Sequence, residues 1–533
     1  MRPATVVPRR LDDVLASLPS SLPAPVSVAS AENDGASTLV SGVTIDSRQV
    51  VPGDLYIAVP GTGRHGADFT AQAVAAGAAA VLTDDDGVPA ASAALGGSSV
   101  PLYRASPVRD YVGPLAGVVF ESQPATGKPV LYGVTGTNGK TTTTYFLNAL
   151  SSALGRSTGL IGTIEIRAGD MAIPSILTTP ESPQVHGILG LMRERGIDAA
   201  AMEVSSHAIE YRRVDGVRFD VVGFTNLTQD HLDLHGSMEE YYAAKAALFR
   251  SDRAVRAVVT VDDPWGRRLA AETDVEVLTL SVAGTGPADW KVVDLVRDGL
   301  GHAFTLCGPD GVRLRLRCGL PGTFNVANAA LAAVMVLASG VDADELQQAA
   351  DGHDPFTTQV PGRMQLVGER PAAIVDFAHN PDALALTLES VRVQGSDSRV
   401  LVVFGATGQR DISKRPIMGA TAARRADVVI VTDDDPHDED DAVIRAGVLE
   451  GALKAQKDEN LHCEILEIFP RAAAIDRAVA LAREGDVVLV AGRGHEVWQE
   501  VKGVNLPLDD RVELAAALTR HGFSALPGNR IES

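Results

Sequence analysis

The chain has 533 residues, of which 45% are hydrophobic and 22% are charged, and its formal net charge is −21 at pH 7. One hydrophobic core does not extend over so many residues, so we expect about three domains. A surface this acidic disfavours nucleic acid and anionic membranes as main partners, although it allows a local basic pocket for phosphates.

Neither cysteine chemistry nor a membrane segment is expected. The three cysteines, Cys307, Cys318 and Cys463, are odd in number and show no C-x-x-C spacing, which argues against a disulfide framework or a zinc site. The first residues include arginines without an apolar run behind them, and no stretch of about 18 apolar residues occurs. We therefore expect a cytoplasmic protein without a signal peptide or a transmembrane span.

Residues 1–125 are predicted to form a small α/β domain. Two short apolar runs at 43–45 and 55–59 indicate strands on either side of a Pro-Gly-Asp turn, and residues 71–84 have a helix–turn–strand pattern. The linker ESQPATGKP closes this domain at residues 121–129.

Residues 126–350 are predicted to form a central ATP-binding domain, like a P-loop ATPase, with a mainly parallel sheet. A strand at 130–136 precedes a glycine-rich turn and a helix at 141–154. Further strand-like runs alternate with helices, which is typical of a sheet covered on both faces. These runs lie at 199–204, 220–227, 257–262 and 275–282, and an apolar helix at 325–340 closes the domain.

Residues 351–533 repeat the alternation and are predicted to form a Rossmann-like, doubly wound domain, although no G-x-G-x-x-G motif opens it. The strand-like runs lie at 372–378, 399–405, 427–432, 464–469 and 486–492. The sequence therefore predicts an α/β protein of three domains.

The strongest local motif is the glycine-rich turn of residues 133–141, GVTGTNGKT. Glycines let backbone N–H groups face phosphate oxygens, and the following helix N-terminus adds partial positive charge. Lys140 can reach the β- and γ-phosphates of a nucleotide, and the Thr141 hydroxyl can ligate Mg²⁺. Counted from Gly133, the motif is one residue off the commonest P-loop spacing.

Three further candidate residues lie at the ends of predicted strands or in the helix-like run YYAAKAALF that follows them. They are Glu203, His231 and Lys245. A single such residue is more often structural than catalytic. Because the carboxyl ends of parallel strands meet at one edge of a sheet, the convergence of several with the P-loop predicts a catalytic site.

Five segments together resemble the ATP-dependent Mur ligases. They are TGTNGKTTT, EVSSHAI, TNLTQDHLDLHG, the AAK of YYAAKAALF, and GTFNVANAALA. The resemblance extends from about Val43 to Glu500 and implies three domains, which bind a UDP-sugar, ATP and an amino acid in turn. It implies a magnesium-dependent, amide-forming ligase of peptidoglycan precursor synthesis, and hence a role in cell-wall biogenesis, cell shape, cell division and the cell cycle.

Within the family, the chain is most similar to the member that adds a diamino acid to UDP-N-acetylmuramoyl-L-alanyl-D-glutamate as third peptide residue. The similarity rests on DSRQVVPGDLYIAVPG, LTTPES, DFAHNPDAL, FGATGQRDISKRP and AGRGHE. We therefore expect the UDP-N-acetylmuramoyl-dipeptide and a diamino acid as substrates. We expect no nucleic-acid partner and no membrane insertion, and we expect the protein to be a monomer.

The resemblance also implies roles for single residues. For ATP it implies Gly136, Thr137, Asn138, Gly139, Lys140, Thr141, Thr142, Asn325, Asn328, Arg363, Asp376 and His379. For the UDP-muramoyl-dipeptide it implies Ile45, Ser47, Thr178, Thr179, Ser205 and Arg213. For the amino acid it implies Arg410, Asp434, Asp435, Pro436, His437, Gly492 and Glu496. For catalysis it implies Lys140, Lys245, His231 and Glu203, and for the metal Thr141, Glu203, His231 and a carbamylated Lys245.

The expected chemistry explains why such residues are needed. A carboxylate is a poor electrophile, so transfer of a phosphoryl group from ATP gives an acyl phosphate that an amine can attack. Cations and fixed dipoles stabilise the charge in both transition states. A free Lys245 ammonium would repel Mg²⁺, whereas a carbamate on its amine is an anion that helps to position the metal.

The amino-acid selector departs from the family pattern. Members that add diaminopimelate usually carry Asp-Asn-Pro-Arg, whereas this chain has Asp434-Asp435-Pro436-His437. A rigid bidentate donor is lost, and an imidazole replaces it only in part. Arg410 and His437 remain as donors for a distal carboxylate, whereas Asp435 would suit the distal ammonium of lysine. We favour meso-diaminopimelate and keep L-lysine as the alternative.

Other activities stay open. A folylpolyglutamate-type ligase is the nearest rival, and residues 46–61 and 177–182 argue against it. A non-catalytic ATP-binding partner should have lost the P-loop lysine or the metal ligands, which are present. A motor or transporter ATPase would usually carry an apolar strand ending in Asp and an arginine finger, and neither pattern is evident.

Overall fold

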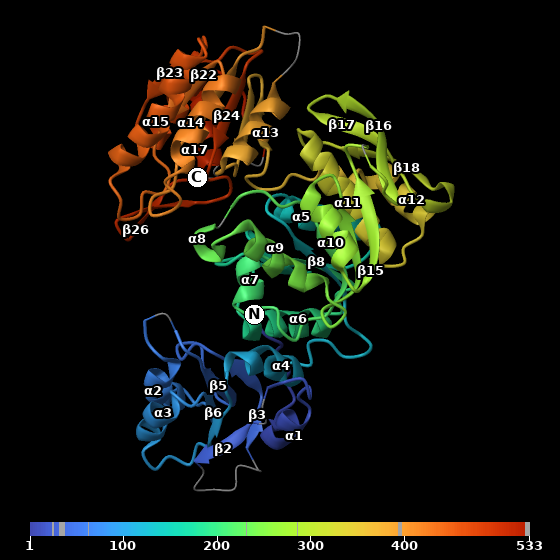
Figure 1. Cartoon of the computed structure of the whole chain (residues 1–533), viewed down its shortest axis with the longest axis vertical. Helices are drawn as coiled ribbons and strands as arrows, with labels where there is room; N and C mark the ends of the chain where they lie inside the picture. The colour runs from blue at the N-terminus through green and yellow to red at the C-terminus, as the bar shows by residue number, and fades with distance from the viewer. Residues whose placement is uncertain are drawn as a thin grey trace.

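The computed structural model describes residues 1–23, 26–30, 38–61, 63–230, 232–284, 286–392 and 397–527. Three large sheets follow one another along the chain, with five, eleven and six strands. Figure 1 shows them as three bodies, the N-terminal one in blue, the central one in green and yellow and the C-terminal one in orange and red. The predicted division after residues 125 and 350 stays a prediction.

The N-terminal sheet has the strand order β2-β7-β6-β5-β4. Its strands are β2 (Ser27–Ser30), β7 (Leu102–Arg104), β6 (Ala80–Thr83), β5 (Asp54–Ala58) and β4 (Gly42–Thr44). Strands β4 to β7 run parallel, and β2 is antiparallel to β7. Apolar residues of α1 (Leu11–Ala16) and α4 (Arg109–Val119) cover one face, and those of α2 (Thr70–Ala75) and α3 (Val88–Leu95) cover the other. A two-stranded ribbon of β1 (Arg9–Arg10) and β3 (Leu39–Val40) lies beside the sheet.

The central sheet has the order β11-β10-β9-β12-β8-β13-β14-β15-β16-β17-β18. Its inner strands, from β9 to β16, are parallel. They are β9 (Thr158–Ile161), β12 (Ala199–Glu203), β8 (Val130–Thr135), β13 (Phe219–Phe224), β14 (Ala254–Thr260), β15 (Glu276–Ser281) and β16 (Trp290–Asp298). Strands buried on both faces are apolar almost throughout, which is why the sequence predicted them.

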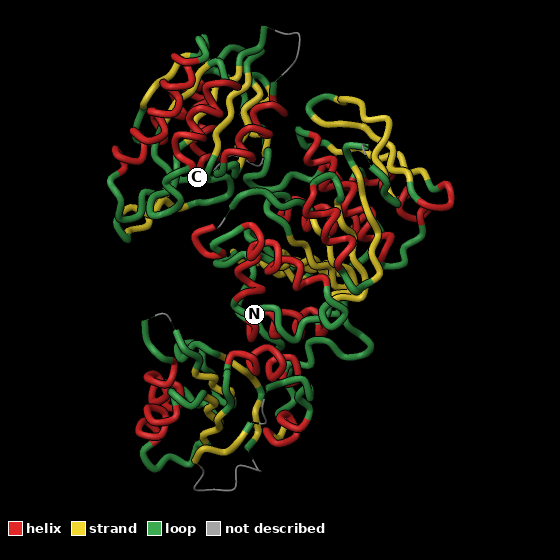
Figure 2. Tube along the Cα trace, viewed as in Figure 1, coloured by secondary structure: helices red, strands yellow, loops and turns green. Residues whose placement is uncertain are grey.

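Helices cover both faces of this sheet, as Figure 2 shows in red. One face packs on α5 (Lys140–Ala153), α11 (Thr323–Ala338) and α12 (Ala343–His353). The other packs on α6 (Ser182–Glu194), α9 (Met238–Ala246) and α10 (Pro264–Glu272). The short helices α7 (Ser206–Glu210) and α8 (Leu232–His235) follow β12 and β13.

Antiparallel strands extend the central sheet at both edges, which the sequence did not predict. They are β10 (Glu165–Ala168) and β11 (Met171–Pro174) at one edge, and β17 (Gly301–Cys307) and β18 (Arg313–Cys318) at the other. In β18, arginines that are exposed alternate with buried Leu314, Leu316 and Cys318. This period of two is the signal of a half-buried strand that the sequence offered.

The C-terminal sheet has the order β19-β20-β24-β21-β22-β23, with only β19 antiparallel. The strands are β19 (Gln365–Glu369), β20 (Ala372–Asp376), β24 (Val487–Ala491), β21 (Val400–Phe404), β22 (Val428–Val431) and β23 (Glu464–Glu467). On one face lie α13 (Pro381–Val391), α14 (Lys414–Arg425) and α15 (Asp441–Asp458), and on the other α16 (Arg471–Leu481) and α17 (Asp510–Arg520). A separate hairpin, β25 (Trp498–Val501) and β26 (Val504–Pro507), projects from this domain (Figure 1).

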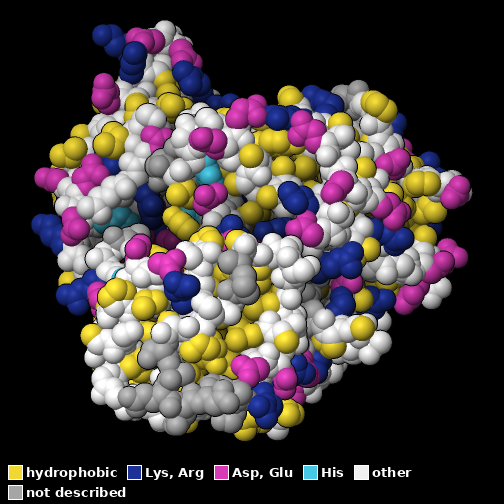
Figure 3. All heavy atoms as spheres, turned by 60° about the horizontal axis from the view of Figure 1, so that its bottom comes forward, with side chains coloured by type: hydrophobic (Ala, Val, Ile, Leu, Met, Phe, Trp, Pro, Cys, Tyr) yellow, Lys and Arg dark blue, Asp and Glu magenta, His cyan; other side chains and the backbone are white. Residues whose placement is uncertain are grey.

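The surface carries both charged and apolar side chains, as expected from a composition with 45% hydrophobic and 22% charged residues. Acidic and basic side chains are interspersed with apolar ones on the face that Figure 3 presents, where the N-terminal domain comes forward. Among the described helices, none is long and apolar enough to cross a membrane.

Candidate active site

The P-loop joins β8 to α5 at the carboxyl edge of the central sheet. Gly136 and Gly139 have φ values of 145° and 92°, which residues with a side chain rarely adopt. A Cβ at Gly136 would collide with Thr225, and one at Gly139 would collide with Asn328. Lys140 folds back over the loop, where its Nζ donates to the carbonyls of Gly136 (3.0 Å) and Thr137 (2.9 Å). The loop therefore presents backbone N–H groups and an ammonium at one helix N-terminus.

Glu203 ends β12, the strand beside β8, and is 1% exposed. Its Oε2 accepts from the hydroxyls of Thr141 (2.8 Å) and Thr163 (2.9 Å), and its Oε1 accepts from the Thr163 N–H (2.8 Å). The two predicted metal ligands Thr141 and Glu203 thus touch each other. Thr163 was not predicted, because only the tertiary pairing of β9 with β12 brings it to this carboxylate.

Lys245 comes from α9, on the opposite face of the sheet from α5, and is 1% exposed. Its Nζ donates to the carbonyl of Gly136 (2.9 Å), the same oxygen that receives Lys140, and lies 4.5 Å from the ring centre of Tyr241. Burial, reinforced by the charge of Lys140, lowers the pKa of Lys245 well below its ordinary value. Burial also lowers the pKa of Lys140. The site therefore favours a neutral amine at Lys245.

Part of the expected metal site lies outside the described residues, namely His231. Its neighbour Asp230 raises the pKa of both Lys140 and Lys245 against the effect of burial, so its charge acts on both amines. Within the described ranges, no three His, Cys, Asp or Glu residues form a group that could hold a metal ion. The proposed metal set differs from such a group, because it includes a threonine hydroxyl and a modified lysine.

Two asparagines expected near the adenine lie on α11 beside the P-loop. Asn328 Nδ2 donates to Asn325 Oδ1 (3.1 Å), and Asn325 Nδ2 donates to the Pro321 carbonyl (2.7 Å). Asn328 Oδ1 accepts from Thr143 of α5 at 3.4 Å. Thr142, on the same helix, is buried. On the other side of the loop, the Asn138 N–H donates to Asn226 Oδ1 (3.1 Å), a partner that was not predicted.

The C-terminal domain brings Arg363, Asp376 and His379 toward this edge. His379 Nε2 lies 3.9 Å from Asp230 Oδ2 of the central domain. The Arg363 guanidinium stacks 4.0 Å from the ring centre of Phe377. Burial lowers the pKa of Arg363, and the negative charges of Asp376 and Glu203 oppose this shift. Carboxylates of both domains therefore stabilise the charged guanidinium. Asp376 itself accepts from the backbone N–H groups of Met364 (2.7 Å) and Ala378 (3.0 Å).

Four residues expected to bind the muramoyl-dipeptide gather around Glu203. The Thr178 hydroxyl oxygen lies 3.1 Å from that of Thr163, and the Thr179 hydroxyl donates to the Glu203 carbonyl (2.8 Å). The Ser205 N–H donates to the Thr179 hydroxyl (3.3 Å). Arg213 donates to Glu181 (2.9 Å) and to the Thr179 carbonyl (3.3 Å).

The expected UDP contacts, Ile45 and Ser47, lie instead in the N-terminal domain, just after β4. The Ser47 hydroxyl donates to Gln72 Oε1 (3.1 Å). A hydrogen bond from Gln184 of α6 to Gln49 (3.3 Å) joins this region to the central domain. The two groups of residues could therefore contact the two ends of one long substrate.

Residues expected to bind the amino acid meet at the carboxyl edge of the C-terminal sheet. Asp434 follows β22, and Gly492 follows β24. Gly492 has φ 114°, and a Cβ there would lie 2.5 Å from Asp434 Oδ2, so only glycine fits. Burial raises the pKa of Glu496 to about 8, and the charges of Asp434 and Asp435 add to this effect.

The altered selector residues already have partners in the structure. Asp435 forms an ion pair with Arg493 and accepts from the Glu500 N–H (3.1 Å). His437, at φ 52°, places Nδ1 3.0 Å from Glu500 Oε2. Sequence reasoning expected Asp435 or His437 to face the substrate and missed Arg493 and Glu500. Arg410 is exposed in the neighbouring loop, which the Gly408 N–H fastens to the Asp435 carbonyl (2.8 Å).

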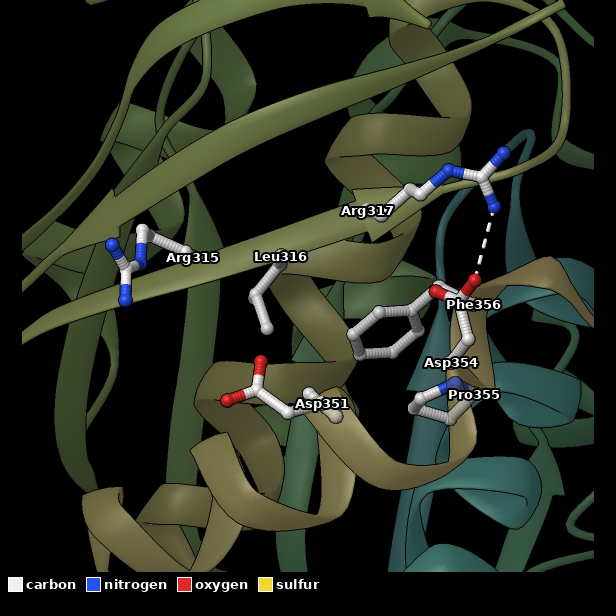
Figure 4. A pocket seen from close by; sticks show the side chains of 8 residues that line it. Arg315, Leu316, Arg317, Asp351, Asp354, Pro355 and Phe356 are labelled. Atoms are coloured by element: carbon white, nitrogen blue, oxygen red, sulfur yellow. Dashed lines mark hydrogen bonds and ion pairs between the residues drawn. The ribbon is translucent and has the colours of Figure 1, made fainter. Parts of the chain in front are cut away.

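A hollow of about 290 Å³ lies elsewhere, between β18, α12 and residues 354–356. Figure 4 shows Arg317 paired with Asp354 on one side of it, with Arg315 and Asp351 on the other. None of its lining residues belongs to the expected site, and its charges largely offset one another.

The P-loop, the buried glutamate beside it, the buried lysine and the Rossmann-like third domain define a nucleotide-using enzyme of several domains. Three family models match in chain order: the Mur ligase family catalytic domain at 39–115, the Mur ligase middle domain at 134–336, and the Mur ligase glutamate ligase domain at 362–494.

Curated relatives cover nearly the whole chain. One, from Leifsonia xyli subsp. xyli, is named UDP-N-acetylmuramyl-tripeptide synthetase and is 45% identical over 91% of this chain and 92% of its own length. Another, from Streptomyces avermitilis, is named UDP-N-acetylmuramoyl-L-alanyl-D-glutamate--2,6-diaminopimelate ligase and is 44% identical over 90% and 92%.

Solved structures agree. A ligase of the latter name is 30% identical, covers 93% of this chain and 98% of its own, and has a TM-score of 0.63. E. coli FolC in complex with DHPP and ADP shares the fold at 22% identity, with a TM-score of 0.55 over 71% of this chain and 89% of its own. The chain belongs to the Mur ligase family, and the predicted family, ligase class and three-domain α/β fold are confirmed.

Proposed function

We propose that this ligase uses ATP to add meso-diaminopimelate to UDP-N-acetylmuramoyl-L-alanyl-D-glutamate, with release of ADP and phosphate. The observation that carries the proposal is the cluster at the P-loop, where Lys140 and Lys245 share one carbonyl and Thr141 touches Glu203. The names of the relatives support this substrate over a folate, because FolC shares only the fold.

The residues at the P-loop fit a magnesium ion. The Thr141 hydroxyl and the Glu203 carboxylate are hard oxygen donors, which Mg²⁺ prefers, and they lie 2.8 Å apart. We assign the ion to these two residues, with His231 and the carbamate of Lys245 completing the set. When bound, it would neutralise charge on the phosphates.

The chain's own groups then act on the reacting atoms. Lys140 and the N-terminus of α5 hold the β- and γ-phosphates, so that the substrate carboxylate attacks the γ-phosphorus and the bond to the ADP oxygen breaks. Arg363 stabilises charge on the same phosphates from the C-terminal side. The amine of the amino acid then attacks the acyl carbon, loses a proton and expels phosphate.

The environment of Lys245 supports its carbamylation. The neutral Nζ attacks the carbon of CO₂, an N–C bond forms, and the nitrogen loses a proton to leave an anion. Because burial and Lys140 lower the pKa of Lys245, the reactive amine is present at a lower pH than for an ordinary lysine. The resulting anion attracts the positive charge of Lys140, whereas an ammonium at Lys245 would repel it.

Two donors are assigned to the distal carboxylate of the amino acid. Arg410 and the Nε2 atom of His437 are the donors that we assign to the distal carboxylate, since Nδ1 of His437 pairs with Glu500. L-Lysine stays the alternative. We also retain the divisions at residues 125 and 350, monomeric action and a cytoplasmic location as part of the proposal.

The test is phosphate release from ATP in the presence of UDP-N-acetylmuramoyl-L-alanyl-D-glutamate and a panel of amino acids. We expect turnover with meso-diaminopimelate and a lower kcat/KM with L-lysine. A ratio in favour of lysine would overturn the amino-acid assignment alone. Turnover only with a folate and glutamate would overturn the proposed function.

A further inference from the structure

Arg493 is a fully buried cation in the middle of the AGRGHE segment, with 0% of its side chain exposed. Its Nη1 donates to Asp435 Oδ1, and its Nη2 donates to the Trp498 carbonyl of the β25–β26 hairpin. The Glu496 Oε2 atom lies 3.9 Å from Nη1. A charged group in such a place is costly unless its partners compensate for it, so its carboxylate neighbours decide what it does.

The backbone around Arg493 leaves it little freedom. Gly492 packs against Asp434, and Gly494, at φ 57°, packs against Gly362, where a Cβ would lie 2.6 Å from the carbonyl oxygen. Each flanking glycine therefore allows a close approach between two segments of the chain. The guanidinium position is set by the fold before any substrate arrives, as a specificity group requires.

Carboxylates outnumber guanidinium groups at this edge. Four acids, Asp434, Asp435, Glu496 and Asp510, face two arginines, Arg471 and Arg493. Arg471 is committed to Asp510, with two contacts of 2.7 Å. Arg493 is committed to Asp435. Asp434 and Glu496 each retain only a longer contact of 3.9 Å, to Arg471 and to Arg493 respectively, but the Asp434 side chain is buried. Among these four acids, Glu496 is therefore the accessible carboxylate without a close ion pair.

More distant charges also face this edge. Lys414 lowers the pKa of Asp434, and Arg363 lowers that of Glu496. Neither supplies a close ion pair to Glu496 in the structure. The side chain of Glu496 is 36% exposed, so a ligand can reach it, whereas Arg493 is sealed behind it. The accessible group of the cluster is therefore acidic and suits an ammonium.

We propose that Arg493 is a specificity-determining residue of the amino-acid site: it cancels the charge of Asp435 and so leaves Glu496 as the single carboxylate that receives a substrate ammonium. The inference rests on the proposed function. Asp435 stands where the family pattern has a neutral asparagine, and its pairing with Arg493 returns that position to a net charge of zero. Arg493 acts through Asp435 and Glu496 and does not itself touch the substrate.

The charge of the substrate makes the inference testable. Meso-diaminopimelate carries two carboxylates and two ammonium groups and is neutral overall, whereas L-lysine has one carboxylate fewer and carries a net positive charge. Without Arg493, Asp435 would become a second uncompensated acid, and the site would favour the more cationic amino acid. Without the charge of Asp435, Arg493 would favour the dicarboxylate.

The experiment compares kcat/KM for meso-diaminopimelate and for L-lysine in the whole enzyme and four variants. Arg493→Met should lower the ratio of the two values about tenfold, since one charge is exposed in a partly buried site. Arg493→Lys, the matched control that keeps the charge, should stay within about threefold of the wild type. Asp435→Asn should raise the ratio, and the double variant Asp435→Asn/Arg493→Met should restore it.

The outcomes separate this inference from the proposed function. If Arg493→Met lowers both kcat/KM values and the use of ATP alike, Arg493 is a structural residue only and the inference is wrong. Should Arg493→Met fail to fold, an unchanged ratio in Asp435→Asn would overturn the inference instead. A wild type that uses neither amino acid would overturn the proposed function together with the inference.

Discussion

Removal of the Lys245 amine should separate its catalytic role from its structural one. Lys245→Met keeps most of the aliphatic volume and loses only the amine, whereas Lys245→Ala also opens space beside the P-loop. In either variant the Gly136 carbonyl still accepts from Lys140 at 3.0 Å, so no buried acceptor is left without a donor.

The magnitudes follow from this geometry. Lys245→Ala deletes about three buried methylene groups, which should cost roughly 2 kcal/mol of stability. Lys245→Met should cost less. If the carbamate oxygens position the metal, both variants should lose at least about 100-fold in kcat, or about 2.7 kcal/mol of transition-state stabilisation. A short carboxylate such as acetate should restore part of the activity of Lys245→Ala, but not of Lys245→Met, where the side chain fills the space.

The assay is phosphate release with and without added carboxylate, alongside thermal unfolding of each variant. Wild-type enzyme prepared with isotope-labelled bicarbonate should show the carbamate carbon by NMR. A Lys245→Met variant that keeps more than about a tenth of the wild-type kcat would refute the carbamate role. Equal rescue of both variants by the added carboxylate would also refute the carbamate role, because such a rescue would not depend on the space that the lysine side chain vacates in Lys245→Ala.

Three other predictions concern the phosphate loop and the amino-acid pocket. Lys140→Ala should reduce ATP-dependent phosphate release by more than tenfold at unchanged far-UV circular dichroism, and a smaller loss would count against the P-loop assignment. Because the pKa of Glu496 in the free enzyme is raised to about 8, its carboxylate should ionise and release a proton when an ammonium binds. The amino-acid KM should therefore fall roughly tenfold from pH 7 to 9, and Glu496→Gln should remove this pH dependence. Calorimetry in buffers of different ionisation enthalpy can measure the proton release. Gly492→Ala should raise the amino-acid KM and lower stability by ~1–3 kcal/mol, since its Cβ would meet Asp434 at 2.5 Å, and an unchanged melting temperature would contradict this.

The parallel core and the nucleotide site were predictable because their signals are local. Buried strands such as β8 and β12 are continuous apolar runs, and each helix that follows them has its own periodicity. The glycines of the P-loop and the residues at strand ends needed only the rule that parallel strands end at one edge. The antiparallel edges were missed, because alternating short strands such as β18 resemble exposed loops unless the period of two is noticed.

The charges around the amino-acid site were decided by the tertiary structure alone. The sequence offered Asp435 and His437 as candidate readers of the substrate, yet the fold pairs them with Arg493, 58 residues away, and with Glu500. Arg471 and Asp510, 39 residues apart, form a wholly buried pair that no local pattern announces. The energy of a charge depends on which opposite charges the fold places within a few ångströms and on how much water the fold excludes from the site. Neither quantity can be predicted from the residues that are adjacent in the sequence.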